Sequence, residues 1–263
     1  MKKYYSYSNK LGMTLLELVA VISILSIVLV MGFGFVVSIA KSNQFISVQS
    51  TLMINSQLAL ERISKELRYS LPYSQRITNN GRCLMFLPVV ATGYYFQTLP
   101  DSSNGLPETG NSAAIALSSY TITAGNAQFF SVGVSDNTEL YGNAPTSLAQ
   151  IQAFTPSSVT LSNDYQWARN SLAQRFFLTD RANAFCVEQN ELRYYSGILP
   201  STTQVNLSNS YDLLASSIQS SLTFYELSSG SDGCRSCVNL LFNFVNDDNQ
   251  LQVVKTATTY YDP

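Results

Sequence analysis

Hydrophobic residues are concentrated in one long run near the start of the chain. Residues 18–40 contain no charged side chain. At a rise of 1.5 Å per residue, a helix over this run would be roughly 35 Å long, which is enough to cross the hydrocarbon core of a membrane. Glu17 stands directly before the run, and a carboxylate in hydrocarbon is costly unless it has a partner. The pattern therefore predicts a membrane-length helix with one functional carboxylate.

The apolar pattern then continues with a helical period. Large apolar residues recur at steps of three and four residues, with a polar gap near Ser56, at Phe45, Val48, Leu52, Leu60, Ile63 and Leu67. Arg62 and Glu66 stand four residues apart, as on an exposed helix face. A helix over residues 13–69 would be roughly 85 Å long. Gly32 and Gly34 are the positions where bending or unwinding of this helix is expected.

After residue 82 the hydrophobic period changes from that of a helix to that of strands. Strands are expected at residues 83–87, 94–96, 128–132, 159–161, 175–178, 184–188, 191–195, 222–227, 238–245 and 252–258. Residues 100–112 are expected to form a loop, and residues 211–218 a short helix. Gln189-Asn190 and Asp247-Asp248-Asn249 are the expected turns of two hairpins. The fold class predicted is α+β, with a long N-terminal α-helix packed on an antiparallel β-sheet domain.

Composition narrows the chemistry. The chain has no histidine, which excludes Ser-His-Asp and Cys-His catalysis and His-ligated zinc sites within it. Its formal net charge is −2, and no cluster of Lys and Arg follows the first residues, so no nucleic-acid partner is expected. The interpretation is a non-enzymatic protein without a cofactor.

The segment before the apolar run carries a processing motif. A leader with Lys2, Lys3 and Lys10 and no acid ends at Gly12, followed by Met13-Thr14-Leu15-Leu16-Glu17. This segment resembles the processing site of type IV prepilins and of the pseudopilins of type II secretion, with Met13 where Phe is usual. The resemblance implies cleavage after Gly12 by a prepilin peptidase and N-methylation of Met13. It also implies that the new amine of Met13 pairs with Glu17 of a neighbouring subunit, which would offset the cost of burying each charge.

Two other interpretations of the N-terminus remain open. An ordinary secretory signal could be cut after Ser38-Ile39-Ala40, and the run could be a plain membrane anchor. The length of the run and Glu17 argue against the secretory signal. The prepilin interpretation divides the chain into a leader peptide (1–12), a transmembrane or filament-core helix (13–40), an amphipathic continuation (41–71) and a periplasmic β-rich domain (72–263). The basic leader stays on the cytoplasmic side, so the protein is expected in the inner membrane with a single pass.

Three short segments of the body are similar to one branch of minor pilin-like proteins. They are residues 67–72 with 83–88, residues 175–178 through Cys186 to 192–195, and Leu213-Leu214-Ala215 before a Phe-Tyr strand. This branch is similar to the MshO biogenesis proteins of mannose-sensitive haemagglutinin pili and overlaps the PilW and J-type pseudopilin groups. Where relatives tend to carry a cysteine before the Phe-Tyr strand, this chain has Ser220-Ser221.

The cysteines are Cys83, Cys186, Cys234 and Cys237. An exported domain permits disulfides, and three pairings are possible. Cys83–Cys186 with Cys234–Cys237 is favoured because the second pair is close in sequence. A four-thiolate zinc site, a redox-active Cys234-Arg-Ser-Cys237 motif and a calcium site at Asp247-Asp248-Asn249 are the alternatives considered, and no metal is expected.

The function predicted from these observations is that of a minor pilin, MshO-like, taking part in assembly of a type IV pilus at or near its tip. The size of the expected head favours an end position. Its partners would be other pilins through the N-terminal helix, the prepilin peptidase and inner-membrane lipid. The alternatives are a J-type pseudopilin of a type II secretion system, an anchored adhesive or ligand-binding domain, and a periplasmic thiol-disulfide enzyme.

Overall fold

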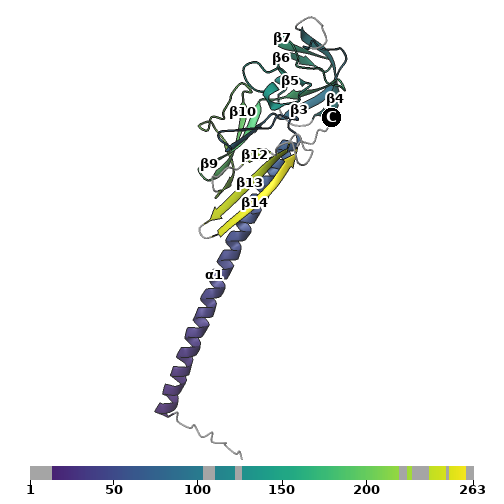
Figure 1. Cartoon of the computed structure of the whole chain (residues 1–263). Helices are drawn as coiled ribbons and strands as arrows, with labels where there is room; N and C mark the ends of the chain where they lie inside the picture. The colour runs from purple at the N-terminus through teal and green to yellow at the C-terminus, as the bar shows by residue number, and fades with distance from the viewer. Residues whose placement is uncertain are drawn as a thin grey trace, which may run out of the picture. The chain divides into compact units, whose positions relative to one another are not determined.

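A computed structural model describes residues 14–102, 110–121, 126–218, 224–226, 237–246 and 249–258. For residues 118–121 and for those after Phe224 it describes the backbone alone. The chain falls into two compact units, Met1–Ser50 and Thr51–Pro263. One long helix, α1 (Leu15–Arg68), contributes residues to both units, and antiparallel strands make up the rest of the second unit (Figure 1). The predicted α+β class, one long N-terminal helix followed by antiparallel sheet, is confirmed.

The helix α1 is continuous and ends close to the predicted position. Gly32 and Gly34 both lie within the α-helical backbone, so the unwinding expected there is not observed. In the second unit one stripe of the helix is buried, formed by Leu52, Ser56, Ala59, Leu60, Ile63 and Leu67. Leu52, Leu60, Ile63 and Leu67 are buried as the sequence pattern predicted. Ser56, expected as a polar gap, is itself buried, and Phe45 is exposed. Arg62 and Glu66 form the expected ion pair on the helix surface at 2.9 Å.

A five-stranded antiparallel sheet has the order β1-β2-β9-β10-β11. Its strands are β1 (Arg76–Thr78), β2 (Cys83–Phe86), β9 (Ala182–Glu188), β10 (Glu191–Ile198) and β11 (Asp212–Ser216). Strands β9 and β10 form the predicted hairpin through Gln189 and Asn190, which both have positive φ.

Both faces of this sheet are covered. On one face Phe86, Phe185 and Tyr194 lie in ring contact, and Arg62 of α1 lies 5.8 Å from the centre of the Tyr194 ring. The side chains of Cys83 and Met85 belong to a second cluster on the other face. Burial on both faces explains why the sequence of β2, Cys-Leu-Met-Phe, is apolar at every position.

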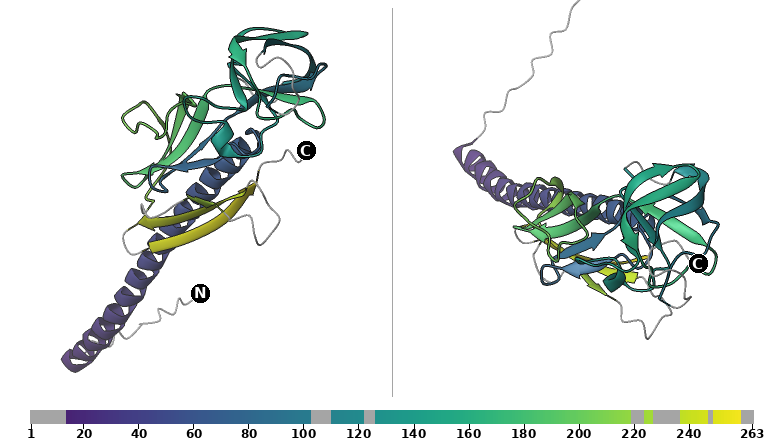
Figure 2. Two further views of the ribbon diagram at one scale, coloured as in Figure 1. Left: turned by 45° about the horizontal axis from the view of Figure 1, so that its top comes forward. Right: turned by 90° about the horizontal axis from the view of Figure 1, so that it is seen from above.

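A closed antiparallel barrel, in the order β3-β4-β7-β6-β5-β8, is inserted in the chain between β2 and β9. Its strands are β3 (Val89–Tyr95), β4 (Gly110–Thr121), β5 (Phe129–Val132), β6 (Leu148–Thr155), β7 (Ser158–Tyr165) and β8 (Arg175–Thr179), with the short helix η1 (Asn137–Glu139) after β5. The teal strands of the barrel are seen from two further directions in Figure 2. Its core includes Trp167, Phe130 and Phe176, whose rings are in contact.

The end of α1 is fixed at the junction of sheet and barrel. The backbone N–H of Leu71 donates to the carbonyl of Leu87 (2.8 Å), and that of Val89 donates to Tyr69 (2.9 Å). These bonds hold the segment after the helix against the two residues that connect β2 to β3. The barrel therefore starts where the helix ends.

A three-stranded sheet closes the chain, with β12 (Phe224–Glu226), β13 (Cys237–Asn246) and β14 (Asn249–Thr258) in that order. Strands β13 and β14 pair from Asn246 and Asn249 onward, so the predicted hairpin is confirmed. Asp247 and Asp248 of its turn lie outside the described residues.

Three predictions about individual segments were wrong. Residues 212–216 form β11 and not a helix, because pairing with β10 buries Ala215 while Leu213 is 55% exposed. Residues 110–112, expected in a loop, belong to β4. Residues 113–155 contain most of β4 and all of β6 in addition to the one strand expected there.

Candidate functional site

Thr14 caps the first turn of α1. Its carbonyl accepts hydrogen bonds from the backbone N–H groups of Glu17 and Leu18, both at 3.1 Å, and its Oγ1 lies 3.4 Å from the N–H of Glu17. Thr14 and Glu17 thus stand at the N-cap and N3 positions, the spacing of a capping box. The signal is present in the sequence as Thr14-x-x-Glu17.

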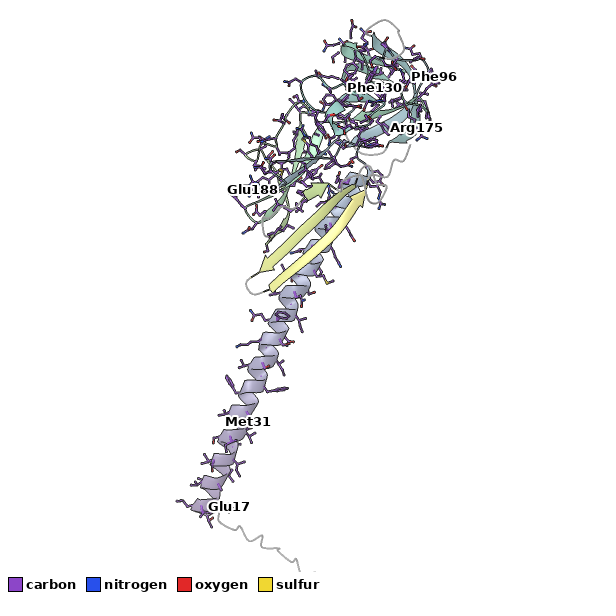
Figure 3. The ribbon with its side chains drawn as sticks, in the orientation of Figure 1. Glu17, Met31, Phe96, Phe130, Arg175 and Glu188 are labelled. Carbon is purple, nitrogen blue, oxygen red and sulfur yellow. A yellow bond between two sulfur atoms is a disulfide. The ribbon has the colours of Figure 1, made fainter. Side chains whose placement is uncertain are left out.

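Glu17 lies in the first turn of α1, the helix end that favours negative charge (Figure 3). Its neighbours Leu15 and Leu16 are 83% and 80% exposed. Within the part of the chain that the structure describes, Glu17 forms no salt bridge. The geometry therefore presents one carboxylate at the start of an apolar helix.

Residues 18–40 of α1 form an exposed, largely apolar cylinder. A window of α1 has a mean hydropathy of 2.7, and this helix is long and apolar enough to cross a membrane. Two of its serine side chains bond back to the helix backbone. The hydroxyl of Ser23 donates to the Val19 carbonyl (2.6 Å) and that of Ser26 to the Ser23 carbonyl (2.8 Å). Because these hydroxyl groups are hydrogen-bonded within the helix, the surface can contact lipid or other helices without leaving a polar group unpaired.

The remaining predicted processing residues, Gly12 and Met13, lie outside the described residues, as does the leader. Among the residues that the structure describes, Thr14 and Glu17 are brought together in the first turn of α1. The proposed cleavage and methylation therefore remain predictions from the sequence.

Cys83 and Cys186 form a disulfide between β2 and β9. This is the pairing that the sequence analysis favoured, and it removes the four-thiolate zinc site from consideration, since two of the four sulfurs are oxidised. Cys234 lies outside the described residues, and only the backbone of Cys237, the first residue of β13, is described. The pairing of Cys234 with Cys237 and the redox alternative both remain predictions.

A comparison with known families concerns the N-terminal segment. Residues 7–33 match the family described as "Prokaryotic N-terminal methylation motif". The N-terminus carries a prepilin signal. This motif indicates the type IV pilin or pseudopilin type, and it implies processing by a prepilin peptidase and assembly with other pilins. Proteins of this type are structural, and the apolar helix α1 fits a membrane-anchored pilin.

The match covers a small part of the chain and includes the start of α1 but no strand. No curated protein and no solved structure matches the chain.

Proposed function

We propose that this chain is a minor pilin of the MshO-like branch that takes part in assembly of a type IV pilus at or near the filament tip. The observation that carries the proposal is Glu17, a carboxylate in the first turn of α1 that lies within the matched prepilin segment and directly before the exposed, uncharged residues 18–40. The protein is stored in the inner membrane as a single-pass protein with its β-rich domain in the periplasm. The helix is then extracted into a bundle of like helices.

The mechanism follows from the cost of burying charge. Cleavage after Gly12 creates an ammonium group at Met13, which is then methylated. In a filament that amine approaches Glu17 of the adjacent subunit, and each group offsets the desolvation of the other. Thr14 contributes by fixing the first turn, so that Glu17 is presented at a defined height on the helix.

The head of the protein supports a place at the end of the filament. The closed barrel inserted between β2 and β9 adds to the five-stranded sheet, so the head is bulkier than one sheet alone would make it. The domain division proposed is 1–12, 13–40, 41–71 and 72–263.

The alternative is a J-type pseudopilin of a type II secretion system, in which the same helix chemistry would serve a secretion filament. Gene neighbourhood separates the two.

The mass of the mature N-terminus tests processing. Purification from cells with an active prepilin peptidase should give a chain that begins at N-methylated Met13. A chain that still carries residues 1–12 would contradict the proposal, and a chain that begins at Lys41 would indicate plain secretion of an adhesive or ligand-binding domain.

Glu17→Gln tests assembly. The variant should be cleaved normally but be recovered in sheared filaments at least about tenfold less than wild type, because the Met13 ammonium would then be buried without its partner. Glu61→Gln is the matched control, since it neutralises an exposed carboxylate of the same helix on the other side of residue 50. Normal incorporation of Glu17→Gln would overturn the assembly mechanism.

A further inference from the structure

A cavity of about 560 Å³ lies where the end of α1, the barrel and the segment before β8 meet. Its apolar wall is formed by Leu71, Pro72, Val134, Leu172 and Phe177. The volume lies in the range of small-molecule sites, which are mostly apolar with a few polar groups that fix the orientation of the ligand. The function proposed above makes no use of this cavity.

The polar groups of the cavity wall are already bonded, with one exception. Arg169 makes two hydrogen bonds to the Glu139 carboxylate, at 2.7 and 2.8 Å. Asn170 donates to the Leu99 carbonyl (2.8 Å) and to the Asp101 carboxylate (2.6 Å). Both side chains are therefore neutralised or saturated by neighbours in the fold.

Arg175 is the exception. Its guanidinium lies 5.9 Å from the centre of the Tyr94 ring, and in the described part of the chain it has no carboxylate partner. Tyr94 and Arg175 are opposite each other in the β3–β8 pair, so the barrel fixes both. The ring supports the cation but does not neutralise it. In Figure 3, Arg175 and the exposed Phe96 lie on the same side of the barrel.

The backbone around the cavity adopts unusual conformations. Tyr73, which lines the cavity, has a φ of 62°, and Gln174, directly before Arg175, has a φ of 53°. Left-handed backbone at bulky residues is costly, and such strain is found preferentially at binding sites. The positive φ angles and the charge of Arg175, unpaired in the described part of the chain, therefore both indicate a binding site at this cavity.

We infer that this cavity binds a small carboxylic acid with an apolar body, the carboxylate pairing with Arg175 and the body lying against Leu172 and Phe177. Charge complementarity selects the carboxylate, because Arg175 supplies the unneutralised cation of the wall and its planar guanidinium matches a carboxylate in geometry. The apolar wall favours an apolar group attached to the carboxylate. Either an acyl chain or an aromatic ring could be this apolar group.

Calorimetric titration of the full chain in lipid nanodiscs, with empty nanodiscs as the blank, tests the inference. The probes are 2-naphthylacetate and its neutral amide, 2-naphthylacetamide. We expect saturable binding of the acid with a Kd of about 1 mM or tighter, the affinity typical of a ligand of this size, and at least about tenfold weaker binding of the amide. Competition by decanoate then distinguishes an acyl from an aromatic preference.

Two variants locate the site. Arg175→Gln should reduce acid affinity about tenfold and leave the amide unchanged, whereas Ala173→Trp, at an exposed position of the cavity wall, should weaken both probes. Arg181→Gln, an arginine that does not line this cavity, is the matched control and should bind as wild type does. Circular dichroism checks that each variant is folded. The inference is overturned if the acid shows no saturable binding, if acid and amide bind equally, or if either cavity variant binds both probes like wild type.

Discussion

Cys83 and Cys186 face each other directly across β2 and β9 and are joined by a disulfide. The two residues are separated by 103 positions in the sequence, and the whole barrel lies between them. The disulfide therefore closes the chain at the root of the barrel, on the face of the sheet that contains Met85.

Removing this disulfide should destabilise the domain strongly. In the chain-entropy model, a cross-link that closes a loop of about 100 residues lowers the entropy of the unfolded chain and so raises its free energy by about 4–5 kcal/mol. We therefore expect Cys83→Ala with Cys186→Ala to lower the free energy of unfolding by about 3–5 kcal/mol, measured by urea denaturation of the full chain in detergent. Wild type under reducing conditions should behave in the same way. A loss below about 1 kcal/mol would contradict this account.

The Glu139–Arg169 pair should make stability depend on acid pH. Partial burial raises the pKa of Glu139, but hydrogen bonds from Arg169, from the Ser135 N–H and from Ser147 outweigh it and hold this pKa below its ordinary value of 4.5. A carboxyl whose pKa is lowered by folding contributes stability above its unfolded pKa and loses it as the pH falls through the folded value.

We expect Glu139→Gln to be about 1 kcal/mol less stable than wild type at pH 7 and to lose less stability between about pH 5 and pH 3. Thermal unfolding at a series of pH values measures this difference. Arg169→Gln should flatten the curve in the same direction. Parallel curves for wild type and Glu139→Gln would argue against the role of the pair.

Gly93 is required by close packing inside the barrel. A Cβ atom at this position would lie 2.2 Å from the Ala116 carbonyl oxygen and 2.8 Å from Cζ of Phe176. Gly93→Ala should therefore lower stability by about 2–3 kcal/mol, measured by the thermal midpoint of unfolding. Gly34→Ala is a suitable control, because a Cβ there meets nothing within 4 Å. Equal thermal midpoints for the two variants would show that the barrel accommodates the added Cβ atom without loss of stability.

The β9–β10 turn depends on residues that tolerate positive φ. Gln189 and Asn190 have φ values of 51° and 64°, as a two-residue hairpin turn requires. Asn190→Val should cost about 1–2 kcal/mol, since β-branched residues are disfavoured at positive φ, whereas Asn190→Gly should change stability by less than about 0.5 kcal/mol. Denaturant midpoints compare the two. A valine variant as stable as the glycine variant would contradict the turn geometry.

The helix and the hairpins could be predicted because their signals are local. The three- and four-residue steps from Leu52 to Leu67 specify one face of a helix, and Gln189-Asn190 between two apolar runs specifies a turn. The processing and assembly residues proposed here, Gly12, Met13 and Glu17, stand out in the sequence for the same reason, because the motif and the apolar run are contiguous. The structure added the contact of the Glu17 N–H with the Thr14 hydroxyl, for which the sequence carries the Thr-x-x-Glu signal.

The barrel could not be predicted because its closure depends on pairings between distant strands. Strand β6 is buried at Leu148 and Ala149 but largely exposed beyond them, so its sequence lacks regular alternation. Register shifts in the β3–β4, β4–β7 and β6–β7 pairs interrupt the two-residue period further. The edge strand β11 was mistaken for a helix because the adjacent leucines 213 and 214 carry no strand period. The role proposed for Arg175 could not be predicted from the sequence either, because it depends on which carboxylates lie near this side chain in the folded domain.

The connection between sheet and barrel has a consequence for how such a head can diversify. The chain leaves the sheet after Phe86 and returns at Ala182, on strands that are already neighbours. The pairing of β2 with β9 does not depend on what lies between these two points, whereas the end of the helix is held by Leu87 and Val89 at the start of the inserted segment. Surface variety can thus accumulate in the rest of the barrel while Leu87 and Val89 stay the same.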